Sequence, residues 1–206
     1  LLLGVSDFLY ILFASFSTFR IISLSLIFES LIIKYLGKFL FGLHLIVTFD
    51  LPECGCLYLS QDLENIVVIG TSHENLSLLE RENFMRTRPK YIIEKLYADK
   101  KIDAYINLST CLRTEFYIEL NSNIDAEKIK NLFSVDMIIK KGMEAIEYLF
   151  KVSCGFYSVI KGEDQILAQV KGAYSEALEN EHSSKFLNII FNKAIELGKK
   201  FRTKSM

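Results

Sequence analysis

The sequence predicts an α+β fold, in which a small sheet with crossing helices is followed by a helical segment. Residues 104–108 and 116–120 alternate apolar and polar side chains with the period of two that is typical of strands. Apolar residues at helical spacing separate the expected strands, and beyond residue 141 only helical patterns remain. Half of the 206 residues are hydrophobic, which suffices for a sizeable core, and the formal net charge of -1 gives no overall nucleic-acid signal.

Residues 1–62, which we call the leader, form an apolar segment of uncertain structure. Residues 1–60 carry seven charged side chains, whereas the other 146 residues carry 42. The stretches 8–28 and 31–49 are each long enough to span a bilayer core, although Arg20 would lie within the first, where a charge costs roughly 2.5–3.5 kcal/mol. Lysines four residues apart also make the second stretch compatible with an amphipathic interfacial helix.

Two explanations of the leader stay open, an upstream extension of the reading frame, which we rank first, and a membrane anchor. A cleaved signal peptide is disfavoured because no basic region and no small-residue cleavage site flank a short apolar run. The chain begins with Leu, so we expect its true start to lie upstream. We therefore expect a leader at 1–62, an α+β domain at 63–182 and the start of a connecting helix at 183–206.

The first part of the domain has the pattern of a buried strand and two helices. Residues 65–71 are a short apolar run closed by glycine, which is typical of a buried strand. Residues 76–84 and 89–100 have helical spacing, and Pro89 suits the first turn of the second helix. The apolar residues expected to face the core from these helices are Leu76, Leu79, Phe84, Ile92, Ile93, Leu96 and Tyr97.

A polar corner, Ser-Thr-Cys-Leu-Arg-Thr at 109–114, joins the two alternating strands. The corner places Cys111 at an edge of the sheet, where the Arg113 guanidinium and outward N–H groups would favour the thiolate. The thiolate is the nucleophilic form of cysteine. The alternative interpretation is a small apolar side chain that fills the edge of the sheet.

The rest of the chain predicts one weak strand and four helices. The helices are expected at 125–133, 142–153 and 163–179, and a last one follows Ser183 and Ser184. The weak strand is expected at 135–140, a turn at 121–123 and a connecting loop at 156–162. Six basic residues at 86–101 and six at 185–204 suit either solvated helix faces or contacts with phosphates.

Two blocks of the sequence resemble the glutamyl-tRNA reductase family, whose members catalyse the first step of the five-carbon route to tetrapyrroles. Ser-Thr-Cys-Leu-Arg-Thr-Glu at 109–115 is similar to the family's Ser-Thr-Cys-Asn-Arg-Thr-Glu. Residues 148–158 resemble His-Leu-Phe-Arg-Val-Ala-Ser-Gly-Leu-Asp-Ser, and residues 162–171 resemble Gly-Glu-Pro-Gln-Ile-Leu-Gly-Gln-Val-Lys. The resemblance runs from about Ile66 to the C-terminus and is absent from the leader.

The resemblance implies an acyl-transfer step followed by a reduction. Cys111 would attack the aminoacyl ester of glutamyl-tRNA and hold glutamate as a thioester, which NADPH would reduce to glutamate-1-semialdehyde. The planar fork of Arg113 would bind the glutamate side-chain carboxylate. Further positions that match substrate-contacting residues of the family are Thr110, Leu112, Ser158, Glu163, Asp164, Gln165 and Gln169. Gln165 and Gln169 share a helix face, because they are four residues apart.

Three residues depart from the family pattern. Leu112 replaces Asn beside the nucleophile, and Asp164 replaces the Pro of Glu-Pro-Gln. Tyr148 replaces a histidine that matters for activity, and a tyrosine cannot act as a neutral imidazole base at pH 7. His73 stands where the family also carries a histidine, so we expect Tyr148 and His73 to modulate activity, and a histidine in a surface turn without a chemical role is the alternative for His73.

The resemblance also implies a cofactor and partners. NADPH is expected on a domain beyond this chain, because no three of the ten glycines form a G-x-G-x-x-G motif. We therefore expect a chain truncated before the NADPH-binding domain, unable to complete the reduction. The expected partners are glutamyl-tRNA, a second copy in a homodimer and the aminomutase of the next step.

The free cysteines suggest a reducing cytosol, so we expect a cytoplasmic protein, with membrane association through the leader as the alternative. Cys54-Gly-Cys56 has no second ligand pair nearby, and no metal site is predicted. A non-catalytic tRNA-binding module and a membrane-anchored interaction module are the competing interpretations of the whole chain.

Overall fold

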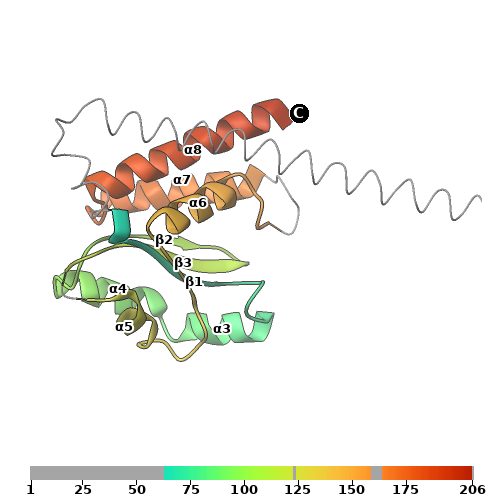
Figure 1. Ribbon diagram of the computed structural model, residues 1–206. Helices are drawn as coiled ribbons and strands as arrows, with labels where there is room; N and C mark the ends of the chain where they lie inside the picture. The colour runs from blue at the N-terminus through green and yellow to red at the C-terminus, as the bar shows by residue number, and fades with distance from the viewer. Residues whose placement is uncertain (1–62, 123, 159–163, 206) are drawn as a thin grey trace, which may run out of the picture. The chain divides into compact units, whose positions relative to one another are not determined.

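A four-stranded antiparallel sheet in the order β2-β3-β1-β4 lies at the centre of the fold (Figure 1). The structure is a computed structural model that describes residues 63–122, 124–158 and 164–205. The strands are β1 (Ile66–Ser72), β2 (Ile102–Ser109), β3 (Arg113–Leu120) and β4 (Ile138–Lys141). The predicted leader, with Cys54 and Cys56, lies outside the described residues.

Helices cover both faces of this sheet (Figure 1). One face carries α3 (Leu78–Arg86), α4 (Pro89–Ala98) and α5 (Ala126–Lys130). The other face carries α6 (Gly142–Ser153), α7 (Asp164–Glu179) and α8 (Lys185–Ser205). The predicted α+β class, with a sheet crossed by helices and a helical segment after it, is therefore confirmed.

The alternation along β3 assigns different chemistry to the two faces of the sheet. Phe116, Ile118 and Leu120 belong to the buried apolar cluster on the side of α4 and α5. Arg113, Glu115 and Tyr117 alternate with them and therefore lie on the face covered by α6. Residue 113 is the first of the strand, so the end of β3 nearest the corner carries a buried polar stripe.

Gly70 of β1 makes the close approach of β3 at this point sterically feasible. It pairs with Glu115 in the antiparallel register. A Cβ atom at residue 70 would lie 2.6 Å from the Thr114 carbonyl oxygen and 2.8 Å from Glu115 Cα. Only a residue without a side chain fits at this distance, so the sequence of β1 helps to fix where the Glu115 carboxylate lies.

The predicted helices are confirmed as elements, but one core residue and several boundaries were wrong. Leu79 is 66% exposed, because α3 buries only Phe84 and leaves its first turns at the surface. Helix α5 ends at Lys130 instead of residue 133, and Phe133 reaches the core from the turn that follows and contacts Phe84 and Phe116. Tertiary packing thus overrides the helical pattern after α5.

No helix in the described part of the chain combines the length and apolar character needed to cross a membrane.

Candidate active site

The corner between β2 and β3 presents Cys111 to solvent on a backbone fixed by hydrogen bonds. The Thr110 N–H donates to the Arg113 carbonyl oxygen over 2.8 Å. Thr110 Oγ1 accepts hydrogen bonds from the N–H groups of Leu112 and Arg113, each over 3.2 Å. The Leu112 carbonyl accepts from the His73 N–H over 2.8 Å, which ties the corner to the end of β1. Cys111 is exposed and has a free thiol, so the geometry leaves its sulfur open to a substrate.

The hydrogen bonds around Cys111 differ from those that the sequence predicted. The N–H groups of Leu112 and Arg113 donate to Thr110 Oγ1, so they do not point outward. The terminal nitrogens of Arg113 contact Glu115 and Tyr157. The expected assistance from outward N–H groups was therefore wrong for these two, because the threonine side chain completes a turn within the corner.

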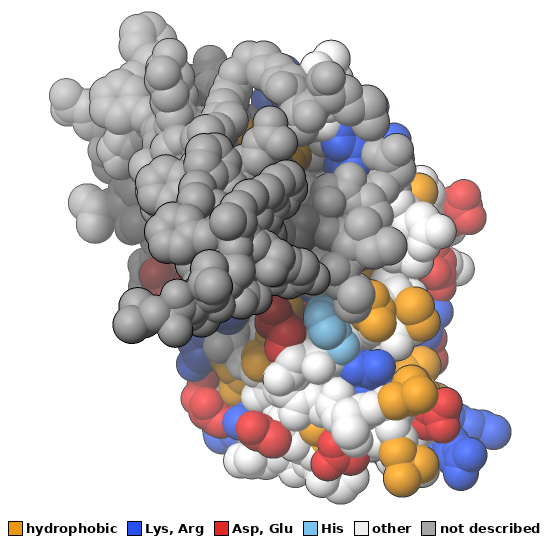
Figure 2. Space-filling view, turned by 90° about the vertical axis from the view of Figure 1, so that its right-hand side faces the viewer, with side chains coloured by type: hydrophobic (Ala, Val, Ile, Leu, Met, Phe, Trp, Pro, Cys, Tyr) orange, Lys and Arg blue, Asp and Glu red, His pale blue; other side chains and the backbone are white. Residues whose placement is uncertain are grey.

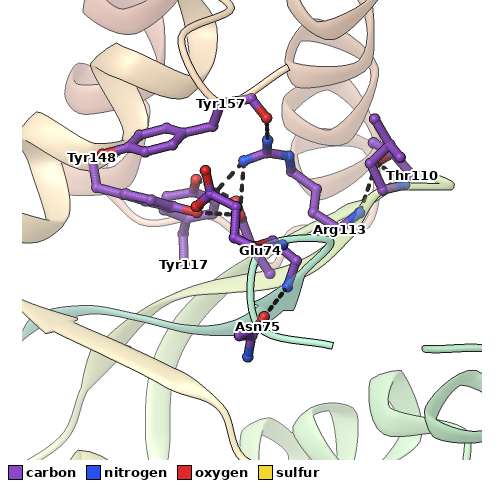
Figure 3. A network of polar contacts seen from close by, with 10 residues as sticks. Glu74, Asn75, Thr110, Arg113, Tyr117, Tyr148 and Tyr157 are labelled. Atoms are coloured by element: carbon purple, nitrogen blue, oxygen red, sulfur yellow. Dashed lines mark hydrogen bonds and ion pairs between the residues drawn. The ribbon is translucent and has the colours of Figure 1, made fainter. Parts of the chain in front are cut away.

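A buried polar network lies behind the corner, on the face of the sheet covered by α6 (Figure 3). Glu115 Oε1 accepts from Arg113 Nη1 over 3.0 Å and from the Tyr148 hydroxyl over 2.7 Å. Glu115 Oε2 accepts from the Tyr117 hydroxyl over 2.9 Å. The Arg113 and Glu115 side chains are 1% and 0% exposed. Because both carboxylate oxygens have donors, this buried charge is compensated.

The network sets the protonation states of its members. Burial raises the pKa of Tyr148 and of Tyr117 well above the ordinary value, and the negative charge of Glu115 raises both further. Burial is the largest single effect and would lower the pKa of Arg113, but Glu115, Tyr148 and Tyr117 together outweigh it and the pKa of Arg113 is raised. Arg113 therefore stays charged, and both tyrosines stay neutral hydrogen-bond donors.

Two N–H groups of the Arg113 guanidinium have no partner among the described residues, although the side chain is only 1% exposed. Nη1 donates to Glu115 and, over 3.5 Å, to the Tyr148 hydroxyl, while Nη2 donates to the Tyr157 carbonyl. These bonds use three of the five N–H groups that a guanidinium carries. The Nε–H and the second Nη2–H lie on one edge of the planar group, in the geometry that a carboxylate matches with two bonds.

Tyr148, a residue expected to modulate activity, lies in this network as a neutral hydrogen-bond donor. Its ring lies against Tyr157 at a centroid distance of 5.0 Å, and Lys140 Nζ lies 5.5 Å from the ring centroid. Its hydroxyl points at Glu115 (Figure 3). With its raised pKa, Tyr148 serves the site as a fixed donor that holds Glu115.

The structure brings together only part of the predicted substrate-binding residues. Thr110, Leu112 and Arg113 flank Cys111 in the corner and on β3. Ser158 is buried at the end of a described segment, where its N–H faces the Gly155 carbonyl over 3.4 Å. Gln165 is exposed and Gln169 half-buried on α7, which begins at Asp164. Glu163 and the side chain of Asp164 lie outside the described residues.

His73 lies beside the corner, at the end of β1. Its N–H binds the Leu112 carbonyl, and its side chain is half-buried. Its Nδ1 atom is buried and has no hydrogen-bond partner among the described residues. The His73 backbone is therefore bound to the residue that follows Cys111, and its imidazole has a ring nitrogen without a partner among the described residues.

Helix α3 contributes a wall of the site that the sequence analysis missed. A pocket of about 500 Å³ beside the corner is lined by Leu78, Arg81, Glu82, Met85, Arg86, Thr110, Cys111, Arg113 and Thr114. The α3 residues 78, 81, 82 and 85 follow the i, i+3, i+4, i+7 spacing of one helix face, which was the available signal. The role of Glu115 was also missed, although it stands in the quoted motif and alternates with Arg113.

Comparisons with known proteins agree over the described domain. Residues 69–205 match the family model described as glutamyl-tRNAGlu reductase, N-terminal domain. The chain is 89% identical over 145 residues to a glutamyl-tRNA reductase of Fusobacterium nucleatum, an alignment that covers 70% of this chain and 44% of that protein. It is 37% identical over 151 residues to the glutamyl-tRNA reductase of Clostridium novyi, covering 68% of this chain and 36% of that protein.

A solved structure shares the fold and spans more than the matching region. Glutamyl-tRNA reductase from Methanopyrus kandleri superposes with a TM-score of 0.60 and 30% sequence identity, covering 68% of this chain and 35% of that chain. This chain thus spans less than half the length of these relatives. On the match over residues 69–205 and these identities, the chain belongs to the glutamyl-tRNA reductase family and contains its N-terminal domain.

Proposed function

We propose that this chain carries out the acyl-transfer step of a glutamyl-tRNA reductase, with Cys111 as the nucleophile. The observation that carries the proposal is the exposed free thiol of Cys111 on a hydrogen-bonded corner beside a pocket of about 500 Å³. Cysteine is suited to this step because its thiolate attacks an activated ester readily and gives a reactive thioester. A rigid corner adds precise positioning of the sulfur.

The proposed step is a transesterification from oxygen to sulfur. The Cys111 thiolate attacks the carbonyl carbon of the ester that links glutamate to the terminal ribose of tRNA. The new S–C bond forms, the C–O bond to the ribose breaks, and the ribose oxygen takes up one proton. We propose His73 as the donor of this proton, because its backbone is bound to the corner through the Leu112 carbonyl and its Nδ1 has no partner among the described residues.

Arg113 is proposed to bind the side-chain carboxylate of the glutamyl group through its Nε and Nη2 edge. Glu115, Tyr148 and Tyr157 hold the opposite part of the guanidinium, so the Nε and Nη2 edge has one orientation. Arg113→Lys keeps the charge but loses the planar fork, which should slow acylation by glutamyl-tRNA at least about tenfold. Equal rates for both proteins would remove this role from Arg113.

Further residues are proposed to bind the rest of the glutamyl group. Ser158, Glu163, Asp164, Gln165 and Gln169 match the family's substrate-contacting positions, and Leu112 and Thr110 flank the thiol. A substrate ammonium group would need acceptors such as the Glu163 carboxylate or the glutamine amide oxygens. Single alanine substitutions should raise the half-saturating glutamyl-tRNA concentration. An unchanged concentration would show that the substituted residue does not bind the substrate.

For the whole protein we propose the family's NADPH-dependent reduction of the glutamyl thioester to glutamate-1-semialdehyde, which frees the Cys111 thiolate, in tetrapyrrole (porphyrin and haem) biosynthesis. The described residues do not fit NADPH. Their sheet is antiparallel throughout, without the parallel crevice and glycine-rich strand-to-helix turn of dinucleotide-binding folds. We therefore derive no reduction step from these residues.

We also propose that the protein is a cytoplasmic homodimer and that its aldehyde passes to the aminomutase of the next step. These proposals rest on the family alone. Sedimentation of the purified protein tests the dimer, and co-purification with the aminomutase tests the transfer; a monomer, or no association, would contradict them.

Covalent labelling tests the acyl-transfer proposal. The protein incubated with radiolabelled glutamyl-tRNA should acquire a label that hydroxylamine removes, and Cys111→Ser should abolish it. Cys154→Ser is the matched control, because burial raises the pKa of Cys154 to about 12 and keeps this thiol unreactive. A folded protein without Cys111-dependent label would instead favour a non-catalytic tRNA-binding module.

A further inference from the structure

Helix α3 presents to solvent a face that combines apolar and cationic side chains. Leu78 is 63% exposed and Met85 46% exposed. Arg81 and Arg86 line the same pocket, and neither forms an ion pair with another residue of the described ranges. Figure 2 shows this side of the molecule, with hydrophobic side chains at the surface beside Lys and Arg. Such a face offers unused binding capacity directly beside Cys111.

We propose that this face of α3 binds the terminal adenosine of the tRNA, the leaving-group side of the ester. The inference rests on the proposed function, which makes an aminoacyl-tRNA the substrate of Cys111. The apolar side chains of Leu78 and Met85 contact the base, and Arg81 and Arg86 contact the phosphate that precedes it. Glu82 accepts a hydrogen bond from the ribose hydroxyl or the adenine amino group.

The two faces of the sheet separate the two halves of the ester. Arg113 and Glu115 lie on the face covered by α6, whereas α3 lies across the opposite face (Figure 1). Cys111 stands at the corner between them. If Arg113 binds the glutamyl carboxylate, the ribose on the other side of the attacked carbon extends toward α3.

The α3 face is held in place before any ligand binds. A capping box fixes the start of the helix, in which Ser77 and Glu80 exchange hydrogen bonds. Thr114 Oγ1 donates to Met85 Sδ over 3.2 Å and ties the helix to β3. Arg81 Nη1 donates to the Leu76 carbonyl over 3.1 Å, while its buried Nε has no partner among the described residues. Preorganisation of this kind lowers the cost of binding.

The size of the pocket agrees with a nucleotide. Its volume of about 500 Å³ falls within the range of about 300–1,000 Å³ typical of small-molecule and cofactor sites. An adenosine with its phosphate is a ligand of that class, and its planar base and anionic phosphate match the apolar and cationic side chains that α3 supplies.

Binding of deacylated tRNAGlu tests the inference without any chemical step. We expect the full chain to bind tRNAGlu that ends in adenosine about tenfold more tightly than the same RNA lacking this nucleotide, at one fixed salt concentration. Arg86→Ala, and separately Leu78→Ala, should bring this ratio close to one. Both side chains are at the surface, so the variants should fold.

Arg88→Ala is the matched control, since Arg88 is an exposed arginine two residues further along that does not line the pocket. This variant should keep the wild-type ratio of the two affinities even if it weakens the binding of both RNAs. A wild-type ratio of one, or a ratio retained by both α3 variants, would overturn the proposal.

A second measurement separates this inference from the proposed function. A glutamyl thioester of a small thiol carries no nucleotide, so its transfer to Cys111 reports on the nucleophile alone. Wild-type protein that shows the adenosine preference but no transfer would refute the proposed function and uphold the α3 site. Transfer without the adenosine preference would uphold the function and refute the α3 site.

Discussion

At the scale of single residues, the site depends on the fully buried carboxylate of Glu115. Glu115 is 0% exposed and accepts from Arg113, Tyr117 and Tyr148. Its charge helps to raise the pKa of Arg113 against the effect of burial, and it compensates the buried guanidinium. Glu115 therefore positions the guanidinium of Arg113 on the buried face of the sheet, while Cys111 stays exposed at the corner.

Replacing Glu115 should destabilise the fold far more than replacing a surface partner. Glu115→Gln keeps the size but leaves Arg113 buried without a counter-charge, which should cost about 3–5 kcal/mol in the free energy of unfolding. Glu176→Gln is the control; it breaks the Lys90–Glu176 pair of 2.6 Å, whose side chains are 42% and 53% exposed. That change should cost less than about 1 kcal/mol. Urea unfolding measures both changes in free energy. Equal costs would show that the buried charge of Arg113 does not need the counter-charge of Glu115.

The raised pKa of Tyr148 predicts that the unfolding free energy depends on pH in the alkaline range. Its folded-state pKa is raised above the ordinary value of 10.0, so only the unfolded chain loses this proton as the pH rises past about 10. The unfolded state then binds fewer protons than the folded state, and stability falls by about 1.4 kcal/mol per pH unit for this group. Its contribution is fully present below pH 10.

Tyr148→Phe should therefore reduce the decline of unfolding free energy between pH 10 and 11 by about 1 kcal/mol. At pH 7 it should cost roughly 1.5–3 kcal/mol, because a hydrogen bond to a charged group is lost. Urea titrations at several pH values test this, and parallel curves for the two proteins would contradict the assignment.

At the scale of elements, the register of β1 against β3 places the polar stripe. Gly70 lies opposite Glu115, and the corner between β2 and β3 is tied to β1 by the bond from the His73 N–H to the Leu112 carbonyl. Helix α3 is tied to β3 through Met85 and Thr114. The strand pairing thus fixes the nucleophile, the guanidinium and the α3 wall relative to one another.

Alanine substitutions at two glycines test the importance of the β1–β3 contact, because the unfolding free energy should fall at one position and rise at the other. Gly70→Ala would place Cβ 2.6 Å from the Thr114 carbonyl oxygen and should lower the unfolding free energy by about 1–3 kcal/mol. Gly172→Ala lies in α7 with nothing within 4 Å of its Cβ, and should raise it by about 0.5–1 kcal/mol. Thermal unfolding compares them. Destabilisation of similar size at both positions would contradict the proposed role of the β1–β3 contact.

At the scale of the whole molecule, the sequence predicted the elements but not the partners of its polar residues. Alternation in β2 and β3 and helical spacing elsewhere identified the sheet and its helices, since these patterns are local. The pairing of Glu115 with Tyr148 depends on how α6 packs over β3, across 33 residues. The pocket wall of α3 was missed for the same reason, because contacts distant in sequence decide which helix face stays open.

The central claim is that Cys111 receives the glutamyl group. The most direct measurement is mass spectrometry of the full chain, quenched in acid soon after mixing with glutamyl-tRNA and digested for peptide mapping. We predict a glutamyl adduct on the peptide that contains Cys111, labile to hydroxylamine, with the peptide that contains Cys154 unmodified. An adduct at another residue, or no adduct in a protein shown to be folded, would contradict the account.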